Sequence, residues 1–200
     1  MTAAACHSQI PAEPCWQPRA RSRHVELPAG LSVWLFDAGS LTRRLRQACF
    51  GQFRVQVLGE YWARPLLSEA RLLGVEPRRY VWTREVQLFC DAQPWVFART
   101  VIPPATLRGR GRRLQHLGDR PLGEVLFTAP GVQRGEVQIA RITASQRLHR
   151  RACGALAELP AVIWGRRSLF RIDGRPLLIC EIFLPSLLCS IDNGSVSQSL

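Results

Sequence analysis

The segment YVWTREVQLFCDAQPWVFARTVIP, residues 80–103, gives the clearest indication of how this chain folds. It contains two apolar runs, YVWTREVQLFC and WVFARTVIP, which are rich in aromatic and β-branched residues. The four residues DAQP that join them are typical of a tight turn. This combination predicts two antiparallel strands that form a hairpin.

The first strand of this hairpin, WTREVQLFC, carries a cation on its apolar face. Successive side chains on a strand point to opposite faces, so Arg84 shares a face with Trp82, Val86, Leu88 and Cys90. The other face is mostly polar and is expected to be solvated; it consists of Thr83, Glu85, Gln87 and Phe89. A permanent charge on the core side of a strand needs a partner, which makes Arg84 a candidate site residue.

The other segments predict an α+β fold. A second hairpin is expected where IWGRRSLFRI and PLLICEIFLP flank the turn DGRP, and both QFRVQVL and EVQIARI alternate as strands do. Short helices are expected in SLTRRLRQAC, capped by Ser40, in SEARLLG, from the cap Ser68 to the stop Gly74, and in DRPLGEVLF. Residues 143–160 suggest an inserted helical segment, and RGRGRR a solvated loop. These elements make about six largely antiparallel strands, covered on one face by helices.

Length and composition suit one soluble globular domain, which we place at residues 28–188, since 46% of the chain is hydrophobic and 21% is charged. We expect the proline-containing residues 1–27 to form a poorly ordered arm and the polar residues 189–200 to form a loose tail. No apolar run reaches the roughly 18 residues of a membrane span. The first residues also lack the pattern of a secretory signal, so we expect a cytoplasmic protein, and we expect it to be a monomer.

The seven cysteines are scattered, and no CxxC pair occurs. Cys90 and Cys180 fall inside apolar strands, where a free cysteine behaves as a small hydrophobic residue. We therefore expect a reduced protein without a disulfide framework. The four histidines lie far apart in the sequence and form no ligand pattern, so neither a metal nor a cofactor is expected.

The chain carries a net charge of +12, and all 27 of its cations are arginine. The absence of lysine excludes Schiff-base chemistry on a lysine and a lysine-dependent phosphate loop. The charge favours an anionic partner, either nucleic acid or a small carboxylate or phosphate.

Three charges lie on apolar strand faces: Arg84, Arg99 and Glu181. An unpaired buried charge is unfavourable by several kcal/mol, so each group needs a partner. One alternative is a buried ion pair of Glu181 with Arg84 or Arg99. The other is a ligand whose carboxylate binds an arginine and whose hydroxyl meets the glutamate. Two helix starts, at Leu41 and Leu122, offer free backbone N–H groups for such a ligand, although local sequence alone favours ordinary capped helices at both places.

Several segments together resemble chorismate pyruvate-lyase, the family that makes 4-hydroxybenzoate for ubiquinone. They are YVWTREVQLFCDAQPWVFARTVIP, RPLGEVLFT, IWGRRSLFRI and PLLICEIFLP, in the family's order, with GSLTRRL as a looser match upstream. The resemblance covers roughly residues 31–186. It implies a six-stranded antiparallel sheet with helices packed against it and an enclosed ligand cavity. The stretch 143–160 is longer than the family pattern, and the N-terminal arm does not align.

The resemblance also implies roles for individual residues. Arg84 matches the arginine that binds the ring carboxylate, and Glu181 matches the carboxylate that contacts the hydroxyl at the other end of the ring. Leu41 and Leu122 match positions whose backbone groups close over the ligand. The substrate is chorismate and the product 4-hydroxybenzoate. Arg84 and Glu181 should then point into one cavity without touching each other.

Parts of the reaction stay open in this interpretation. Arg99 or Arg167 could meet the enolpyruvyl carboxylate of chorismate. The proton could move through Glu181 or within the substrate by a pericyclic route.

Two other functions are weighed against a lyase. One is a non-catalytic module that binds aromatic carboxylates, as in the effector domains of some transcription regulators. Such a domain normally follows a DNA-binding domain, and the arm before Pro28 is too short to supply one. The other is a nucleic-acid-binding protein, suggested by the charge and by RGRGRR. Because most aromatic residues fall in core strands, we expect no nucleic-acid partner.

Overall fold

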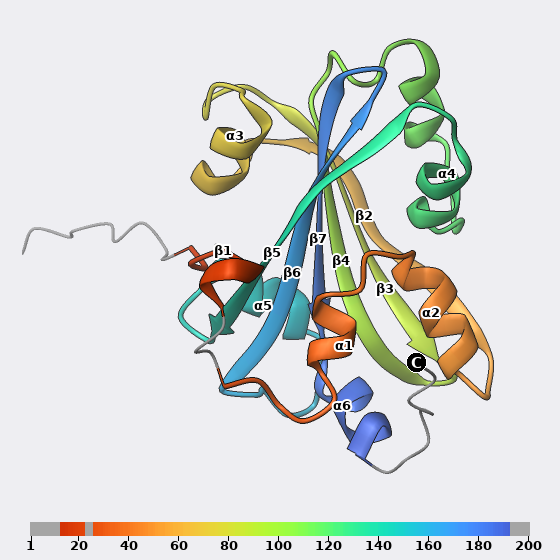
Figure 1. Cartoon of the computed structure of the whole chain (residues 1–200), viewed down its shortest axis with the longest axis vertical. Coiled ribbons are helices and arrows are strands. Elements are labelled where there is room, and N and C mark those ends of the chain that lie inside the picture. Colours follow the sequence, from red (N-terminus) through yellow and green to blue (C-terminus); the bar gives the residue numbers. More distant parts are fainter. Residues whose placement is uncertain (1–12, 23–25, 193–200) are drawn as a thin grey trace, which may run out of the picture.

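The computed structural model describes residues 13–22 and 26–192, and within them the chain forms one antiparallel sheet of seven strands. Their order across the sheet is β1-β5-β6-β7-β4-β3-β2, which puts the two predicted hairpins side by side at its centre (Figure 1). The strands are β1 (Gln17–Pro18), β2 (Phe53–Ala63), β3 (Val81–Cys90), β4 (Gln93–Ile102), β5 (Val132–Thr143), β6 (Val162–Ile172) and β7 (Arg175–Phe183). The α+β class is confirmed, with one more strand than the sequence predicts, because the two-residue β1 joins the edge beside β5.

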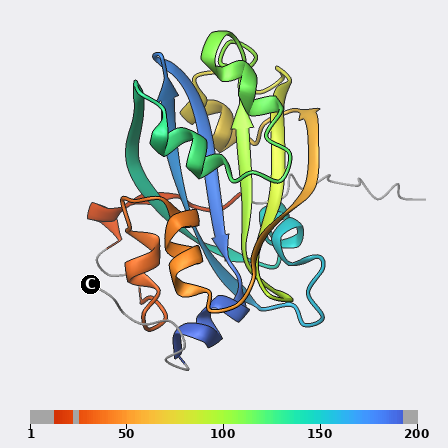
Figure 2. The same ribbon diagram turned by 90° about the vertical axis from the view of Figure 1, so that its right-hand side faces the viewer.

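Helices lie on both faces of the sheet, so the prediction that they cover one face is wrong. On one side lie α1 (Ser32–Leu35), α2 (Leu41–Ala48) and α4 (Leu122–Thr128), whereas α3 (Leu67–Leu73) and α5 (Arg147–Cys153) lie on the other (Figures 1 and 2). The remaining helices are η1 (Arg19–Arg21), η2 (Gly109–Gln115) and α6 (Pro185–Asp192). The central strands require helices on both sides, because each face of β3 carries apolar or ion-paired side chains that are buried.

Both predicted hairpins are present, and their turns have the backbone that tight hairpins require. Asp173 and Gly174 have φ values of 49° and 76°, as a two-residue type I′ turn demands. In the other hairpin Asp91 has a φ of 52°, a conformation that aspartate tolerates better than most residues. Its side chain also accepts a hydrogen bond of 2.7 Å from the backbone N–H of Gln52, which ties the turn to the start of β2.

The face of β3 that was expected to be solvated is buried. Thr83, Glu85, Gln87 and Phe89 are all less than 9% exposed. The polar pattern predicted solvent because alternation alone cannot show what packs on a face. Here α3 and α5 cover it, and the charge on Glu85 is balanced by arginines from other elements.

Local details differ from the predictions at three places. Within the predicted arm, Gln17–Pro18 form β1 and Arg19–Arg21 form η1, while residues 1–12 and 23–25 lie outside the described residues. Helix α6 runs into the predicted tail. Helix α3 begins after Leu66 rather than Ser68, because the Glu69 carboxylate accepts from the Leu66 N–H at 2.8 Å. The RGRGRR segment is largely the short helix η2. The predicted domain boundaries remain an expectation.

The expectation of a chain without disulfides is also wrong, because Cys49 and Cys90 are bonded, with their Cα atoms 5.6 Å apart. The two cysteines are 41 positions apart in sequence. The pairing of Phe53 with Cys90 across β2 and β3 brings the end of α2 next to β3. Cys180 is free and buried, as predicted. No helix among the described residues is long and apolar enough to cross a membrane.

Candidate active site

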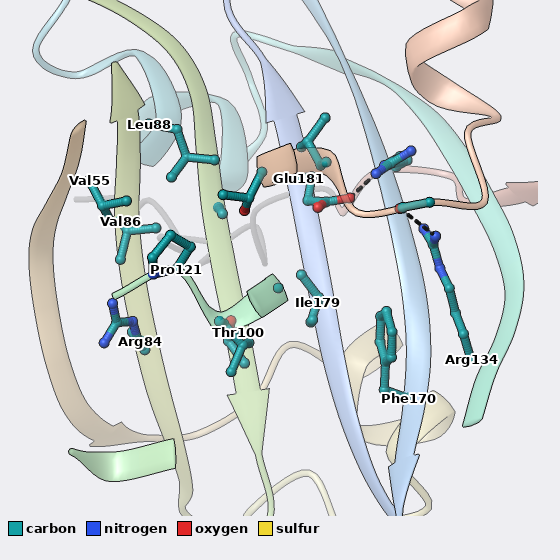
Figure 3. Close-up of a pocket in the computed structure, with 17 residues that line it drawn as sticks. Val55, Arg84, Val86, Leu88, Thr100, Pro121, Arg134, Phe170, Ile179 and Glu181 are labelled. Carbon is teal, nitrogen blue, oxygen red and sulfur yellow. Dashed lines mark hydrogen bonds and ion pairs between the residues drawn. The ribbon is translucent and has the colours of Figure 1, made fainter. Parts of the chain in front are cut away.

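A pocket opens on the face of the sheet that carries α2 and α4, with about 580 Å³ of empty space including its mouth (Figure 3). Its floor comes from the central strands and its roof from the starts of the two helices. Its lining includes all four residues that the sequence singles out: Leu41, Arg84, Leu122 and Glu181. Their roles toward a ligand remain predictions, but segments far apart in the chain bring them to one space.

Arg84 is buried at one end of this pocket, with only 3% of its surface exposed. Its Nη1 atom donates to Glu60 of β2 at 2.7 Å, and its Nη2 atom donates to the carbonyl oxygens of Gly118 and Arg120 at 2.8 and 3.2 Å. Burial lowers the pKa of Arg84, and the neighbouring Glu60 partly offsets this. An arginine stays protonated at neutral pH in spite of such a shift, so this end of the pocket holds a permanent cation.

Glu181 lies across the pocket floor from Arg84 and has a different partner. It accepts a hydrogen bond from Nε of Arg166, its cross-strand neighbour on β6. On β4, Arg84 pairs with Thr100 and Glu181 with Ala98, so the two charges are two strands and two residues apart. With strands about 4.8 Å apart and a rise of about 3.4 Å per residue, their Cα atoms are separated by roughly 12 Å.

This arrangement contradicts both ion pairs considered from the sequence. Arg84 pairs with Glu60, Glu181 with Arg166, and Arg99 with Glu69 and Glu85. Between Arg84 and Glu181 the floor is formed by the small side chains of Ala98 and Thr100. The two charges therefore face one space from opposite ends, with room between them for a flat ring.

The roof consists of two helix starts that nearly touch. Ser40 caps α2, because its side chain accepts from the N–H of Arg43 at 3.4 Å. A Cβ atom on Gly123, in the first turn of α4, would lie 3.2 Å from Thr42 Oγ1 and 3.3 Å from Ser40 Oγ. Glycine at this position thus allows the close approach. Leu41 and Leu122 are the first residues of the two helices, where backbone N–H groups have no carbonyl one turn earlier.

Two further arginines, Arg134 and Arg166, line the pocket and were missed by the sequence reasoning. Arg134 of β5 donates to the carbonyl oxygens of Ala38 and Gly39 at 2.7 and 3.2 Å. Burial lowers its pKa, and the nearby Arg166 lowers it further. Arg166 could have been found only from the register of the second hairpin, because that register places it directly opposite Glu181.

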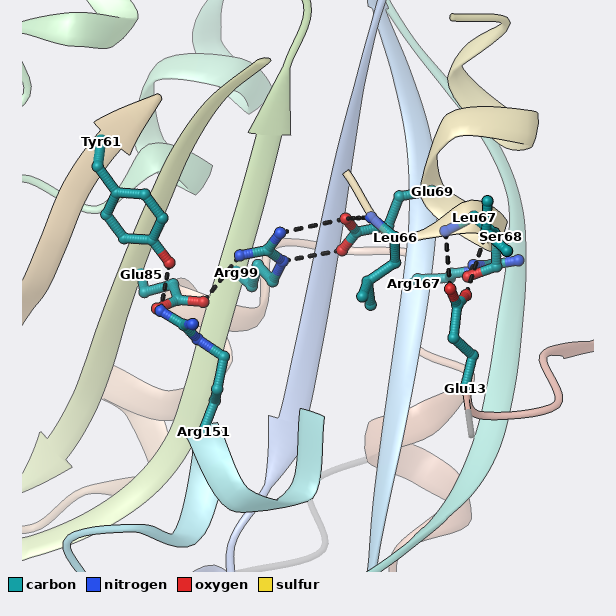
Figure 4. A network of polar contacts seen from close by, with 10 residues as sticks. All are labelled: Glu13, Tyr61, Leu66, Leu67, Ser68, Glu69, Glu85, Arg99, Arg151 and Arg167. Carbon is teal, nitrogen blue, oxygen red and sulfur yellow. Dashed lines mark hydrogen bonds and ion pairs between the residues drawn. The ribbon is translucent and has the colours of Figure 1, made fainter. Parts of the chain in front are cut away.

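Arg99 and Arg167, the candidates for a second ligand carboxylate, lie on the opposite face of the sheet, so that prediction is wrong. Arg167 donates to Gln138 at 2.8 Å and to Ser68 of α3 at 3.1 Å. Arg99 lies between Glu69 and Glu85 and contacts each at 2.8 Å (Figure 4). Each is one residue away in sequence from a pocket-lining residue, and the strand alternation turns it to the other side.

The charges around Arg99 are paired within the protein, and a smaller pocket lined by Arg99, Arg151 and Tyr61 lies beside them. Glu85 also accepts from Arg151 of α5, which contacts the Tyr61 hydroxyl as well (Figure 4). Burial raises the pKa of Glu85, but Arg151 and Arg99 together outweigh it and hold that pKa below its usual range. Burial and the Glu85 carboxylate raise the pKa of Tyr61. Among the described residues, no cluster of histidine, cysteine and carboxylate side chains could hold a metal ion.

Comparison with known proteins shows the family of this chain. The family model for chorismate lyase matches residues 10–191. The chain belongs to the chorismate lyase family. A probable chorismate pyruvate-lyase of Methylococcus capsulatus is 46% identical over 158 residues, covering 79% of this chain and 96% of the relative. A second, from Nitrosospira multiformis, is 36% identical over 188 residues, covering 94% of this chain and 98% of the relative.

Solved structures share the fold at low sequence identity. The C-terminal domain of PhnF matches with a TM-score of 0.53 and 17% identity, covering 66% of this chain and 83% of that domain. A GntR-family transcriptional regulator from Bacillus cereus matches with a TM-score of 0.50 and 13% identity, covering 68% of this chain and 94% of its own. At such identities the likeness shows the fold alone.

Proposed function

We propose that this protein is a chorismate pyruvate-lyase, which converts chorismate into 4-hydroxybenzoate and pyruvate for ubiquinone biosynthesis. The observation that carries the proposal is the pair Arg84 and Glu181. They stand at opposite ends of one pocket and are each held by a separate partner. A para-substituted benzoate has a carboxylate at one end and a hydroxyl at the other, so it matches this spacing of cation and acceptor.

In this proposal Arg84 binds the ring carboxylate through its guanidinium, and Glu181 accepts a hydrogen bond from the ring 4-hydroxyl. The backbone N–H groups of Leu41 and Leu122 approach the ligand from the roof. Arg134, which also lines the pocket, is the cation that we assign to the enolpyruvyl carboxylate. Three arginines and one glutamate in the lining suit a substrate that carries two carboxylates.

The reaction breaks the ether bond at C3 of the ring, and the hydrogen on C4 is removed while the enolpyruvyl methylene gains one. The ring becomes aromatic, which supplies the driving force. The pocket then has to hold a reactive conformer and stabilise the shifting charge away from water. If the hydrogen passes directly within the substrate, Glu181→Gln keeps a substantial kcat; if it passes through Glu181, kcat falls by orders of magnitude.

The proposal is tested by incubating purified protein with chorismate and measuring 4-hydroxybenzoate and pyruvate by chromatography. We expect equimolar formation of both without added metal or cofactor. Folded protein that releases neither product contradicts the proposal. If such protein binds 4-hydroxybenzoate without turning over chorismate, the alternative of a ligand-binding module with this fold is correct.

We further propose that the protein is a cytoplasmic monomer without a nucleic-acid partner. Reducing systems keep most cytosolic thiols free, so this location predicts that Cys49 and Cys90 are reduced in the cell. Trapping of free thiols in rapidly quenched cells measures their state. Light scattering of the purified protein measures its mass in solution.

A further inference from the structure

Arg166 is the most completely buried cation at the pocket, with 1% of its surface exposed. One edge of its guanidinium donates through Nε to Oε2 of Glu181. Its Nη1 atom donates to the carbonyl oxygens of Trp34 at 2.7 Å and Asp37 at 2.9 Å. A single planar group therefore joins β7 to α1 and to the segment between α1 and α2.

This double attachment limits where the Glu181 carboxylate can point. A glutamate side chain has several rotatable bonds, and a free one samples many orientations. The guanidinium is rigid and is anchored on two backbone carbonyls, so the oxygen that it contacts is fixed in place. Arg166 holds Oε2, and Oε1 of the same carboxylate is left for a group inside the pocket.

The anchored segment also leads into the roof. Asp37 precedes the cap Ser40 by one short turn, and Arg134 binds the intervening carbonyl oxygens of Ala38 and Gly39. Burial raises the pKa of Asp37, but its hydrogen bonds with Gly39 and Arg44, together with the charges of Arg44 and Arg166, bring that pKa below its usual value. The floor residue Glu181 and the roof residue Leu41 are thus held relative to each other through Arg166.

We propose that Arg166 is a positioning residue that aims Glu181 at the ligand hydroxyl, and that it thereby sets the preference of the pocket for 4-hydroxylated over unsubstituted benzoates. This inference rests on the proposed function, because it takes the ligand to be an aromatic carboxylate whose hydroxyl faces Glu181. Arg166 acts through Glu181 rather than on the reacting atoms.

Arg167 provides a matched control. It is the next residue on β6, is 7% exposed, and donates to side chains of its own surroundings, but it faces the other side of the sheet. Replacing Arg167 should destabilise the fold for the same reason as replacing Arg166, because in both cases a buried hydrogen-bonding group loses its partner. The Arg167 replacement should leave the orientation of Glu181 unchanged.

The experiment measures the Kd of 4-hydroxybenzoate and of benzoate by calorimetry for the wild-type protein, Arg166→Lys, Arg166→Gln and Arg167→Gln. A hydrogen bond to a charged group changes affinity by roughly ten- to a hundredfold, so the wild-type ratio of the two Kd values should lie in that range. We expect both Arg166 variants to bring the ratio close to one, because 4-hydroxybenzoate should lose much more affinity than benzoate. Arg167→Gln should keep the wild-type ratio.

A wild-type ratio that persists in a folded Arg166 variant overturns the inference, as does an equal loss in Arg167→Gln, since the ratio would then follow stability alone. If the wild-type protein binds neither acid, the proposed function fails first, and the variants need not be compared. Should neither Arg166 variant fold, a crystal structure of the wild-type protein with 4-hydroxybenzoate gives the answer. We expect the hydroxyl at Oε1 of Glu181 with Arg166 on Oε2, and any other location of the hydroxyl contradicts the inference.

Discussion

The two faces of the sheet bury the same kinds of charged side chain, but the charges are arranged differently around the space beside them. On the face toward α3 and α5, Arg99 is enclosed by Glu69 and Glu85, and Arg151 completes the network. On the face toward α2 and α4, Arg84 and Glu181 have separate partners and line a pocket. Arg99 is paired with two carboxylates at once, which favours a structural role. Arg84 and Glu181 stand apart at opposite ends of a pocket, which favours binding of a ligand between them.

The largest expected loss of stability concerns Arg99, on the face toward α3 and α5. Arg99→Met leaves two buried carboxylates, Glu69 and Glu85, without their shared cation. Breaking a buried ion pair from one side costs about 3–5 kcal/mol, because the remaining charge is uncompensated. Urea denaturation should show that loss, while the Kd for 4-hydroxybenzoate of the remaining folded protein stays near the wild-type value. A large loss of affinity with unchanged stability would reverse the roles assigned to the two faces.

A somewhat smaller effect is expected from the covalent link on the pocket side. The Cys49–Cys90 bond joins the end of α2, whose start forms the roof, to the end of β3. Breaking a disulfide that closes a loop of this size lowers the free energy of unfolding by about 2–4 kcal/mol. Reductant should lower the stability of the wild-type protein by that amount and should not affect Cys49→Ser. Cys15→Ser, which replaces an exposed free cysteine, serves as the control. Equal stability with and without reductant contradicts this expectation.

The pocket charge is tested by Arg84→Ala. Removing a hydrogen-bonded charge partner of a ligand carboxylate costs about 1.5–3 kcal/mol, or roughly ten- to a hundredfold in Kd. We expect that loss for 4-hydroxybenzoate in calorimetry, together with a smaller loss of stability because Glu60 loses its partner. Unchanged product affinity in a folded Arg84→Ala protein removes Arg84 from the binding site.

The smallest effect concerns Glu85, on the face toward α3 and α5, and its contribution to how the stability of the protein depends on pH. Arg151 and Arg99 hold the pKa of Glu85 below its usual range. Stabilisation by this carboxylate is therefore complete above about pH 4.3, the usual glutamate value, and is lost as the pH falls through the lower pKa of the folded state. Denaturation between neutral and acidic pH should show a shallower acid loss for Glu85→Gln than for wild type. Parallel curves for the two proteins contradict this expectation.

Local patterns in the sequence were sufficient for most of the secondary structure. Both hairpins, the helix that Ser40 caps, and the helix start at Leu122 follow from alternation, turn residues and capping preferences over a few neighbouring positions. The same alternation identified Arg84, Arg99 and Glu181 as charges on strand faces that need partners. It could not show which partners they have, because Glu60, Glu69 and Arg166 come from segments whose location depends on strand order.

By itself the sequence determined that this is an α+β protein of the chorismate lyase kind, with an arginine and a glutamate on apolar strand faces. Only the tertiary structure decided that Arg84 and Glu181 share a pocket, that Arg99 and Arg167 do not, and that Cys49 meets Cys90. The physical reason is that strand alternation fixes the face of each residue relative to its neighbours. Whether a charged residue on that face meets a protein partner, a cavity or both depends on the order and register of the strands and on the helices that cover them.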